Sequence, residues 1–432
     1  MSMQAGAIAT NRAESDASPS APLRRNRDFS VFWLGQALSA LGDAFALIAL
    51  PLLVLQATGS VAQMGLLTGA FGVGQLIAGL FSGALVDRVD RRRLMILCDS
   101  GRCLLYAAVP LGWWILGPHI WLLYAVVIGG AIFGNIFQVA YITAVANLVE
   151  ADQLTEANGR LQATLGVAFV LGPALAGLVS ARFGPAQAIG LDALTFAVSG
   201  LSLSRVGLRR RTGMHAAPPR RGPMVELLAG LHFVWRQPVL RSLVLLYGAF
   251  ALLLAGINDV FIFHLKHDLH QGDAAVGLLF GVGSVGMIVG GLAAPALRRR
   301  LGFGICWIGG LILVGISIVT IGLTTGIAVL LALSIVWTVG DQLMGVNSMS
   351  LRQQITPDHL LGRVTAAFWT LIGVSAPLGS AGSTWLAARR GAPTVLWATG
   401  ALTIAIALSA LLTPVRLRHP EQCALVLHVQ SP

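Results

Sequence analysis

The sequence has little charge for its length. Of its 432 residues, 11% are Asp, Glu, Lys or Arg, compared with about a quarter in soluble domains, and 56% are hydrophobic. A water-soluble surface cannot be built from this composition. The net charge of +11 could suggest a nucleic-acid partner, but the positive residues come in short bursts between apolar runs. We therefore expect a lipid bilayer as the environment and no nucleic acid.

Patterned cysteines and nucleotide-binding motifs are also missing. The four cysteines follow neither a CxxC spacing nor a disulfide framework, so we expect no disulfide and no metal site. No Gly-x4-Gly-Lys-Ser/Thr loop is present, so ATP-driven pumping is not indicated and no cofactor is expected. A His-rich metal set, or a nucleophile with a base in reach, is missing as well. The chain is therefore predicted not to be an enzyme.

Long apolar runs fill most of the chain. A spanning helix needs about 20 mostly apolar residues, and polar or Gly/Pro breaks cut the sequence into about twelve such segments. The fold class predicted is an all-α integral membrane protein with twelve transmembrane helices in two six-helix halves. The predicted spans are 30–57, 62–86, 94–116, 119–148, 161–182, 185–205, 243–265, 275–297, 302–325, 327–350, 364–387 and 393–414.

Arginine placement predicts the orientation of these spans. The bursts fall in the N-terminal tail, in every second loop and in a long central segment, and the opposite loops carry few basic residues. By the positive-inside rule, both termini are expected on the cytoplasmic side of the cell membrane. The predicted organisation is a disordered cytoplasmic tail (1–28), a first half (29–205), a cytoplasmic central loop with an interfacial helix (206–242), a second half (243–415) and a cytoplasmic tail (416–432).

A short internal repeat supports two related halves. The segment 152–163, DQLTEANGRLQA, resembles the segment 358–366, DHLLGRVTA, and the two follow spans 4 and 10. The match is short, but it falls at equivalent points of the two halves, where a duplicated fold would place it.

The loop after the second span carries an unusual concentration of charge. The stretch SGALVDRVDRRRLMILCDSGR (82–102) lies between two apolar runs. Its arginines alone would follow from membrane orientation, but that leaves Asp87, four residues after Gly83, unexplained. This pattern resembles the signature loop of the major facilitator superfamily, which reads Gly, three residues, Asp, Arg/Lys, any, Gly, any, Arg/Lys, Arg/Lys. Here Arg88, Arg92 and Arg93 occupy the basic positions, and Asp90 stands where the pattern has Gly.

The resemblance covers residues 24–415, and its DR-x-DRR form is similar to that of exporters of the enterobactin and macrolide-efflux type of drug:proton antiporters. It implies that the loop acts as a cytoplasmic gate. Asp87 would interact with the N-terminal end of span 11, since a helix N-terminus stabilises an anion. Arg88 and Arg363 would be its partners, and Asp99 and Arg102 on span 3 could extend the network.

A second feature of the same family lies in span 5. The stretch LGVAFVLGPALAGL is similar to an antiporter motif with a Gly-Pro pair and spaced glycines, carried here by Gly166, Gly172, Pro173 and Gly177. The alternative is that these small residues only allow close helix packing, as in any membrane bundle.

Several polar residues lie within the predicted spans, where a polar side chain is costly and therefore either has a partner or serves a function. Family architecture places spans 1, 4, 7 and 10 around a central cavity. We therefore predict a substrate and proton pathway on those spans, although polar packing between helices is the alternative for any single member. Its members are Asp43, Asn135, Gln138, Asn258, Asp259, Asp341 and Gln342. Asp43 and Asp341 fall near the middle of the membrane and are the candidates for proton coupling, whereas Asp99 and Asp192 are expected to serve structure or gating.

The stretch HLKHDLH, which contains His264, His267, Asp268 and His270, has metal-like spacing but no clear further ligand, so a solvated helix end is the preferred interpretation. We predict a secondary active exporter, monomeric, that exchanges small amphipathic compounds for protons. The alternatives are a carrier of one metabolite such as a siderophore, for export or uptake, and a transport-inactive membrane receptor or scaffold.

Overall fold

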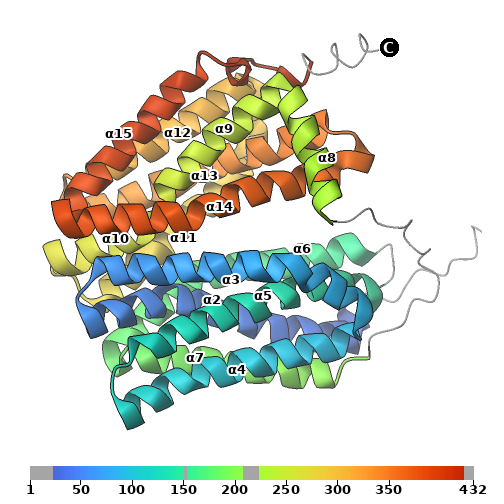
Figure 1. Cartoon of the computed structure of the whole chain (residues 1–432), viewed down its shortest axis with the longest axis vertical. Helices are drawn as coiled ribbons and strands as arrows, with labels where there is room; N and C mark the ends of the chain where they lie inside the picture. The colour runs from blue at the N-terminus through green and yellow to red at the C-terminus, as the bar shows by residue number, and fades with distance from the viewer. Residues whose placement is uncertain (1–22, 150–152, 208–222, 423–432) are drawn as a thin grey trace, which may run out of the picture.

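The computed structural model describes residues 23–149, 153–207 and 223–422, and all regular structure in these ranges is helical. The predicted tail 1–28, the central loop and the tail 416–432 lie partly outside the described residues. Figure 1 shows the long helices in two stacked groups, with α2 to α7 in one and the remaining helices in the other. We call these groups the first and second halves.

The first half follows the predicted spans closely. Some of its helices begin at side-chain caps: Asn26 accepts from the N–H of Phe29, and Ser60 accepts from that of Gln63. The helices are α2 (Arg27–Thr58), α3 (Val61–Arg88), α4 (Arg91–Leu116), α5 (Ile120–Leu148), α6 (Leu154–Phe183) and α7 (Pro185–Ser204).

The second half starts with α8 (Pro223–Arg236), at the position of the predicted interfacial helix. Its other elements are α9 (Pro238–Leu254), α10 (Ile257–Phe263), the π-helix η3 (His264–Asp268), α11 (Asp273–Leu301), α12 (Phe303–Ile321), α13 (Ile327–Ile355), α14 (Asp358–Arg390) and α15 (Ala392–Ala410). Two single-turn 3₁₀ helices, Leu23–Arg25 and Pro414–Arg416, flank the bundle.

Eleven helices of the described chain are long and apolar enough to cross a membrane, counting α9, α10 and η3 as one span. The predicted span 364–387 lies within α14, which is not among the eleven. Figure 1 nevertheless places α14 alongside the other long helices, next to α9 and α3. The fold is therefore an all-helical membrane bundle, as the sequence predicts.

The predicted helix 243–265 is broken in the structure. Gly256 adopts φ 77°, which ends α9 and starts α10, and a Cβ at this position would lie 2.7 Å from the Cα of Ser380 in α14. The hydroxyl of Ser383 donates to the carbonyl of Ala255 at 3.0 Å, so a backbone group freed by the break keeps a partner. Only glycine fits here, since the site combines a left-handed conformation with a close backbone neighbour.

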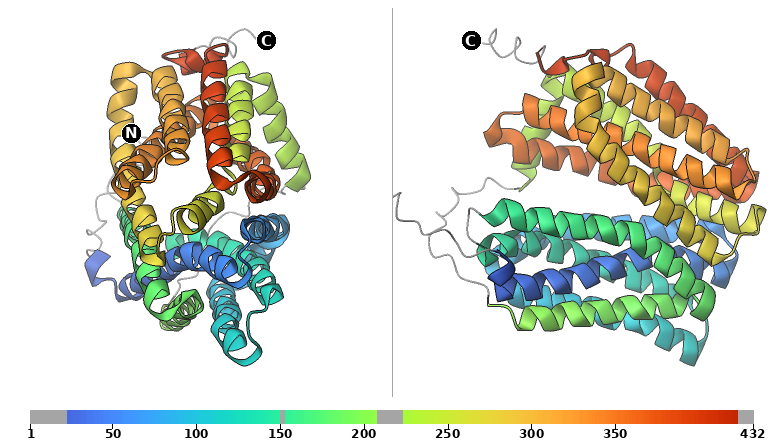
Figure 2. Two further views of the ribbon diagram at one scale, coloured as in Figure 1. Left: turned by 90° about the vertical axis from the view of Figure 1, so that its left-hand side faces the viewer. Right: turned by 180° about the vertical axis from the view of Figure 1, so that it is seen from behind.

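The two halves meet along two helix pairs, α3 with α14 and α6 with α11 (Figure 2). The repeated segments of the sequence lie at the starts of α6 and α14, so each pair includes one helix that begins with such a segment, although residue 152 lies outside the described part. Four hydrogen bonds between described residues cross from one half to the other: Gln56 to Asp273, Thr68 to Asp259, Ser380 to the carbonyl of Gly65 and Ser284 to that of Phe169.

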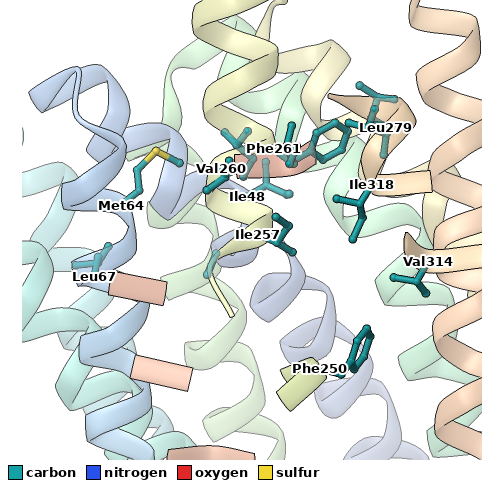
Figure 3. Close-up of a cluster of buried hydrophobic side chains, with 14 of the residues drawn as sticks. Ile48, Met64, Leu67, Phe250, Ile257, Val260, Phe261, Leu279, Val314 and Ile318 are labelled. Carbon is teal, nitrogen blue, oxygen red and sulfur yellow. The ribbon is translucent and has the colours of Figure 1, made fainter. Parts of the chain in front are cut away.

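A continuous apolar cluster crosses the same boundary. Figure 3 shows Ile48 and Met64 of the first half near Ile257, Val260 and Phe261 of α10, with further apolar side chains of α11 and α12 beyond them. Because these side chains are buried together, the short helix α10 is held between the halves by packing.

We expect Gly256→Ala to lower the stability of the protein by at least about 1–2 kcal/mol, because alanine is strained at positive φ and its Cβ would collide with α14. Thermal unfolding of the purified protein in detergent measures the effect. Gly248→Ala in α9 is the matched control, since a Cβ there meets nothing within 4 Å. Equal melting temperatures for the two variants would show that the break does not depend on Gly256.

Candidate functional site

A cavity of about 600 Å³ lies between the halves and is lined by residues of α2, α3, α4, α5, α6, α10 and α11. Five of the residues predicted for a substrate and proton pathway line it: Asp43, Asn135, Gln138, Asn258 and Asp259. The fold thus brings five polar residues that are distant in the sequence around one space.

An ion pair forms part of the cavity wall. The guanidinium of Arg102 on α4 donates to the carboxylate of Asp43 on α2. The Asp43 side chain is half exposed to the cavity, whereas that of Arg102 is 9% exposed and stacks 3.7 Å above the ring of Phe196 on α7. The pair therefore joins a cavity-facing acid to a buried base.

Two more carboxyl groups lie behind this pair. Asp99 and Asp192 are fully buried, and both act electrostatically on Arg102. Both oxygens of Asp99 and one oxygen of Asp192 have no hydrogen-bond partner among the described residues. The other Asp192 oxygen accepts from the hydroxyl of Thr195 at 3.2 Å. One arginine thus forms an ion pair with Asp43 and interacts electrostatically with two further acidic residues in the interior of the first half.

Close packing of α2 on α7 makes this arrangement possible. Gly42 precedes Asp43, and a Cβ on Gly42 would lie 2.2 Å from an oxygen of Asp192 and 2.1 Å from the hydroxyl of Thr195. Only a residue without a side chain allows the two helices to approach this far. Asp43 and Asp192 are therefore brought near the same guanidinium by a glycine.

Asp259 joins the halves instead of standing alone in the cavity. Its carboxylate accepts a hydrogen bond from the hydroxyl of Thr68 on α3 at 2.6 Å, and the residue is 3% exposed. Asn258, its neighbour on α10, is exposed at the cavity surface. Asn135 donates to the side-chain oxygen of Gln75 on α3 at 2.7 Å, so it is fixed within the first half.

The structure separates Asp341 and Gln342 from the cavity-lining set. Asp341 lines a second cavity of about 330 Å³, whose walls come mainly from the second half and partly from α2 and α6. Gln342 lines neither cavity and packs against α11, where a Cβ on Gly290 would lie 2.9 Å from its own Cβ. These neighbours in sequence point to different faces of α13, so they do not share one site.

The predicted gate residues divide into two groups. Beyond their place in α3, the structure does not describe the surroundings of Gly83 or the side chains of Asp87 and Arg88. Asp90, which replaces the glycine of the family pattern, caps α4 by accepting from the N–H of Arg93 at 3.0 Å. Arg92 donates to the carbonyls of Leu203 and Ser204 at the end of α7, where a cation is favoured by the helix dipole.

The remaining gate candidates lie elsewhere. Asp99 and Arg102 belong to the charge cluster in the interior of the first half, as described above. Arg363, near the start of α14, is partly buried, and α8 packs closely on its backbone: a Cβ on Gly230 would lie 2.3 Å from its carbonyl oxygen. Arg93 is exposed.

The antiporter-like motif lies where helices approach most closely. A Cβ on Gly172 would lie 2.3 Å from that of Ala44 on α2, and one on Gly177 would lie 2.6 Å from the backbone oxygen of Asp273. The carbonyl of Pro173 faces Gly277 of α11, whereas a Cβ on Gly166 would contact no described residue of another helix within 4 Å. Three of the four residues thus allow close packing of α6, two of them against the other half.

The histidine cluster forms local acid–base contacts. His264 and His267 both lie within hydrogen-bond distance of Asp268, at 2.7 Å and 3.0 Å, and His267 stacks on Phe263. Within the described chain, no group of three or more His, Cys, Asp or Glu side chains could hold a metal ion.

Sequence reasoning did not identify Gln75, Thr68 and Phe196 as site residues. Gln75 is a polar residue within a predicted span, so its depth could have indicated a role. Thr68 and Phe196 carry no such signal, because threonine and phenylalanine are common in membrane helices and only the fold places them beside Asp259 and Arg102.

The chain is similar to known transporters over most of its length. A sequence model of the Major Facilitator Superfamily matches residues 32–380 and 260–424. The multidrug efflux pump Tap of Mycobacterium tuberculosis is 26% identical over 348 residues, covering 79% of this chain and 83% of the relative. The enterobactin exporter EntS of Citrobacter koseri is 25% identical over 364 residues, covering 82% of this chain and 83% of the relative.

Solved structures share the fold at lower identity. The nucleoside transporter NupG superposes with a TM-score of 0.72 at 11% identity, covering 89% of this chain and 98% of that one. A bacterial homologue of the iron transporter ferroportin, in its inward-facing state, superposes with a TM-score of 0.66 at 19% identity, covering 89% of this chain and 98% of that one.

We expect Arg102→Met to destabilise the protein by about 3–5 kcal/mol, because it leaves three buried or half-buried carboxyl groups without their cation. Adding Asp43→Asn should restore part of this loss, since one of the unpaired acids is then neutral. Thermal unfolding of the two single variants and the double variant measures the coupling. Arg389→Met is the control: it removes an arginine stacked on Trp385 at an exposed site, so a change within about 0.5 kcal/mol is expected. Strictly additive losses in the cycle would mean that Asp43 and Arg102 are not coupled.

Proposed function

Because the chain belongs to the major facilitator superfamily, a family of transporters and not of enzymes, it is a multi-pass secondary transporter of small molecules, and we propose that it exports small amphipathic compounds in exchange for protons. The exchange would proceed by alternating access, in which the two halves open the cavity to one side of the membrane at a time. We further propose that both termini face the cytoplasm, since the arginine bursts lie on that side under the positive-inside rule.

The Asp43–Arg102 pair is the observation that carries the proposal. It places an acid of α2 at the surface of the cavity of about 600 Å³ between the halves, which we call the main cavity, and an arginine behind it. A carboxylate that can be reached from a cavity and is held by a salt bridge in the membrane interior is suited to exchange a proton, because protonation would remove half of the ion pair.

Proton binding at Asp43 would change the position of Arg102. Once Asp43 is neutral, the nearest remaining acids are Asp99 and Asp192, which lie deeper in the first half and act on the same guanidinium. The guanidinium would therefore turn away from the cavity on protonation and return when Asp43 loses its proton. This two-position arginine gives the first half a way to respond to the proton gradient.

The loop around Asp87 would act as the cytoplasmic gate of the same cycle. The support is the family pattern in the loop, together with the capping of α4 by Asp90 and of α7 by Arg92, which fix the ends of the two helices next to the gate. The same proposal includes Arg88 and Arg363 as partners of Asp87 in the gate. It also includes an antiporter role for the glycines of span 5.

A second candidate is the export of one dedicated metabolite such as a siderophore. The similarity to an enterobactin exporter supports it, whereas the similarity to a multidrug efflux pump supports broad efflux. A substrate screen in an efflux-deficient bacterial host, with energised dye export as the readout, separates the two.

We expect an imposed pH gradient to drive substrate uphill in vesicles that contain the wild-type protein, and to fail in vesicles that contain Asp43→Asn. The amide keeps the shape and hydrogen bonding of the site but cannot exchange the proton. Downhill exchange of the same substrate should remain in this variant. Asp28→Asn, which removes an acid at the start of α2 outside the cavities, is the matched control. If Asp43→Asn, Asp341→Asn and the double variant all respond to the gradient like wild type, a facilitator becomes the better interpretation.

We expect Asp87→Asn to slow transport by about threefold or more at equal expression, because the gate loses the anion that would be stabilised by a helix N-terminus. Asp90→Asn removes a charge from the same loop but keeps a good helix cap, so it should transport at nearly the wild-type rate. Initial transport rates in vesicles provide the measurement. Equal slowing by both substitutions would point to loss of loop charge in general and not to a specific gate.

A further inference from the structure

The second cavity lies across α10 from the main cavity. Its walls come mainly from α10, α11 and α13, and it has a volume of about 330 Å³. Leu47, Asn258 and Phe280 line both cavities, so the two spaces adjoin at these residues. The break at Gly256 creates this junction, because it turns α10 out of line with α9 and leaves Asn258 facing the opening.

Asp341 is the one ionisable residue among those that line the second cavity. No lysine, arginine or histidine of the described residues forms an ion pair with it, and no described side chain donates a hydrogen bond to it. The hydroxyls around Asp341 donate their hydrogen bonds elsewhere: those of Ser284, Ser334 and Thr338 donate to backbone carbonyls at 2.7, 2.9 and 2.5 Å. The cavity thus presents an acid without a counter-charge.

Aromatic rings surround the same space. Phe261 lies between Phe280 and Trp337, with ring centroids at 5.9 Å and 6.2 Å. Trp337 and Asp341 are four residues apart on α13, so they face the cavity from the same side of the helix. The faces of aromatic rings attract cations, tryptophan most strongly, and the effect grows when the site excludes water.

We propose that the second cavity is a binding site for a monovalent organic cation, an amine or quaternary ammonium with apolar substituents, held by Asp341 and the ring of Trp337. This rests on the proposed transport function, since it assigns part of the transported compound to this cavity. A hard metal ion would not fit well, because such ions need several oxygen ligands, and this cavity offers one carboxylate, one amide and hydroxyls that already donate to backbone carbonyls.

The main cavity has a different electrostatic character. There the carboxylate of Asp43 already has the guanidinium of Arg102 as its partner, so a cation would have to compete with a buried arginine. A substrate would therefore place its positive group at Asp341 and its uncharged polar part near Asn258, at the junction. The two acids of the mid-membrane region would then have separate roles, with Asp341 binding substrate and Asp43 exchanging protons.

Direct binding of benzyltrimethylammonium to the purified protein in lipid nanodiscs tests the proposal. The probe has one ring and a permanent positive charge, so its own protonation does not change with pH. Titration calorimetry should detect binding to the wild type. We expect the dissociation constant to rise about tenfold or more in Asp341→Asn, which removes the charge at constant shape, and to stay near the wild-type value in Asp341→Glu. Trp337→Leu should weaken binding by about threefold or more.

Two controls keep the result specific. Trp397→Leu removes an exposed tryptophan outside both cavities and should leave the dissociation constant unchanged, and the uncharged isostere neopentylbenzene should not distinguish Asp341→Asn from wild type. The proposal is overturned if the wild type does not bind the probe, or if Asp341→Asn and Trp337→Leu both bind it like wild type. The result is separate from the test of proton-coupled export: binding without gradient-driven transport would contradict the proposed function alone, and transport without this binding would contradict the cation site alone.

Discussion

Arg102 is the residue around which the first half is arranged. A guanidinium in the membrane interior is costly unless it is paired, and here its partners come from several helices: Asp43 from α2, Phe196 and Asp192 from α7, and Asp99 from its own helix. The close approach of α2 and α7 at Gly42 makes these contacts possible. Structure and proposed function therefore depend on the same interaction, because the pair that satisfies the buried charge is also the pair that a proton could break.

The interface between the halves depends on small residues instead of charges. Gly177 meets Gly277 at a backbone separation that no side chain would allow, and Gly65 lies against the side chains of Ser380 and Thr384 in α14. Such contacts are close, and the described residues of the two halves are joined by few hydrogen bonds and no ion pair. An interface of this kind can part and reform at modest cost, which suits two halves that move against each other.

The position of α10 links these two features. Because Gly256 breaks the seventh span, α10 sits between the halves, with apolar side chains packed toward α2 and α11 and with Asp259 hydrogen-bonded to Thr68 across the boundary. It also separates the two cavities. A movement of the halves would change the walls of both cavities together, so the proposed proton exchange at Asp43 and the proposed ligand binding at Asp341 would be mechanically connected through this short helix.

The sequence by itself determined the membrane class and the approximate positions of most helices, because apolar runs of spanning length are local properties that the chain displays directly. The polar residues within these runs are visible in the same way, and five of the seven predicted for a pathway line the main cavity. Only the tertiary structure decided which polar residues meet. Asp43 and Arg102 are 59 positions apart, and nothing in their spacing predicts a pair. Asp341 and Gln342 are adjacent but face different surroundings, and the break at Gly256 depends on the close approach of α14. Partnership across helices is set by rotation and packing of whole helices, which a linear pattern does not contain.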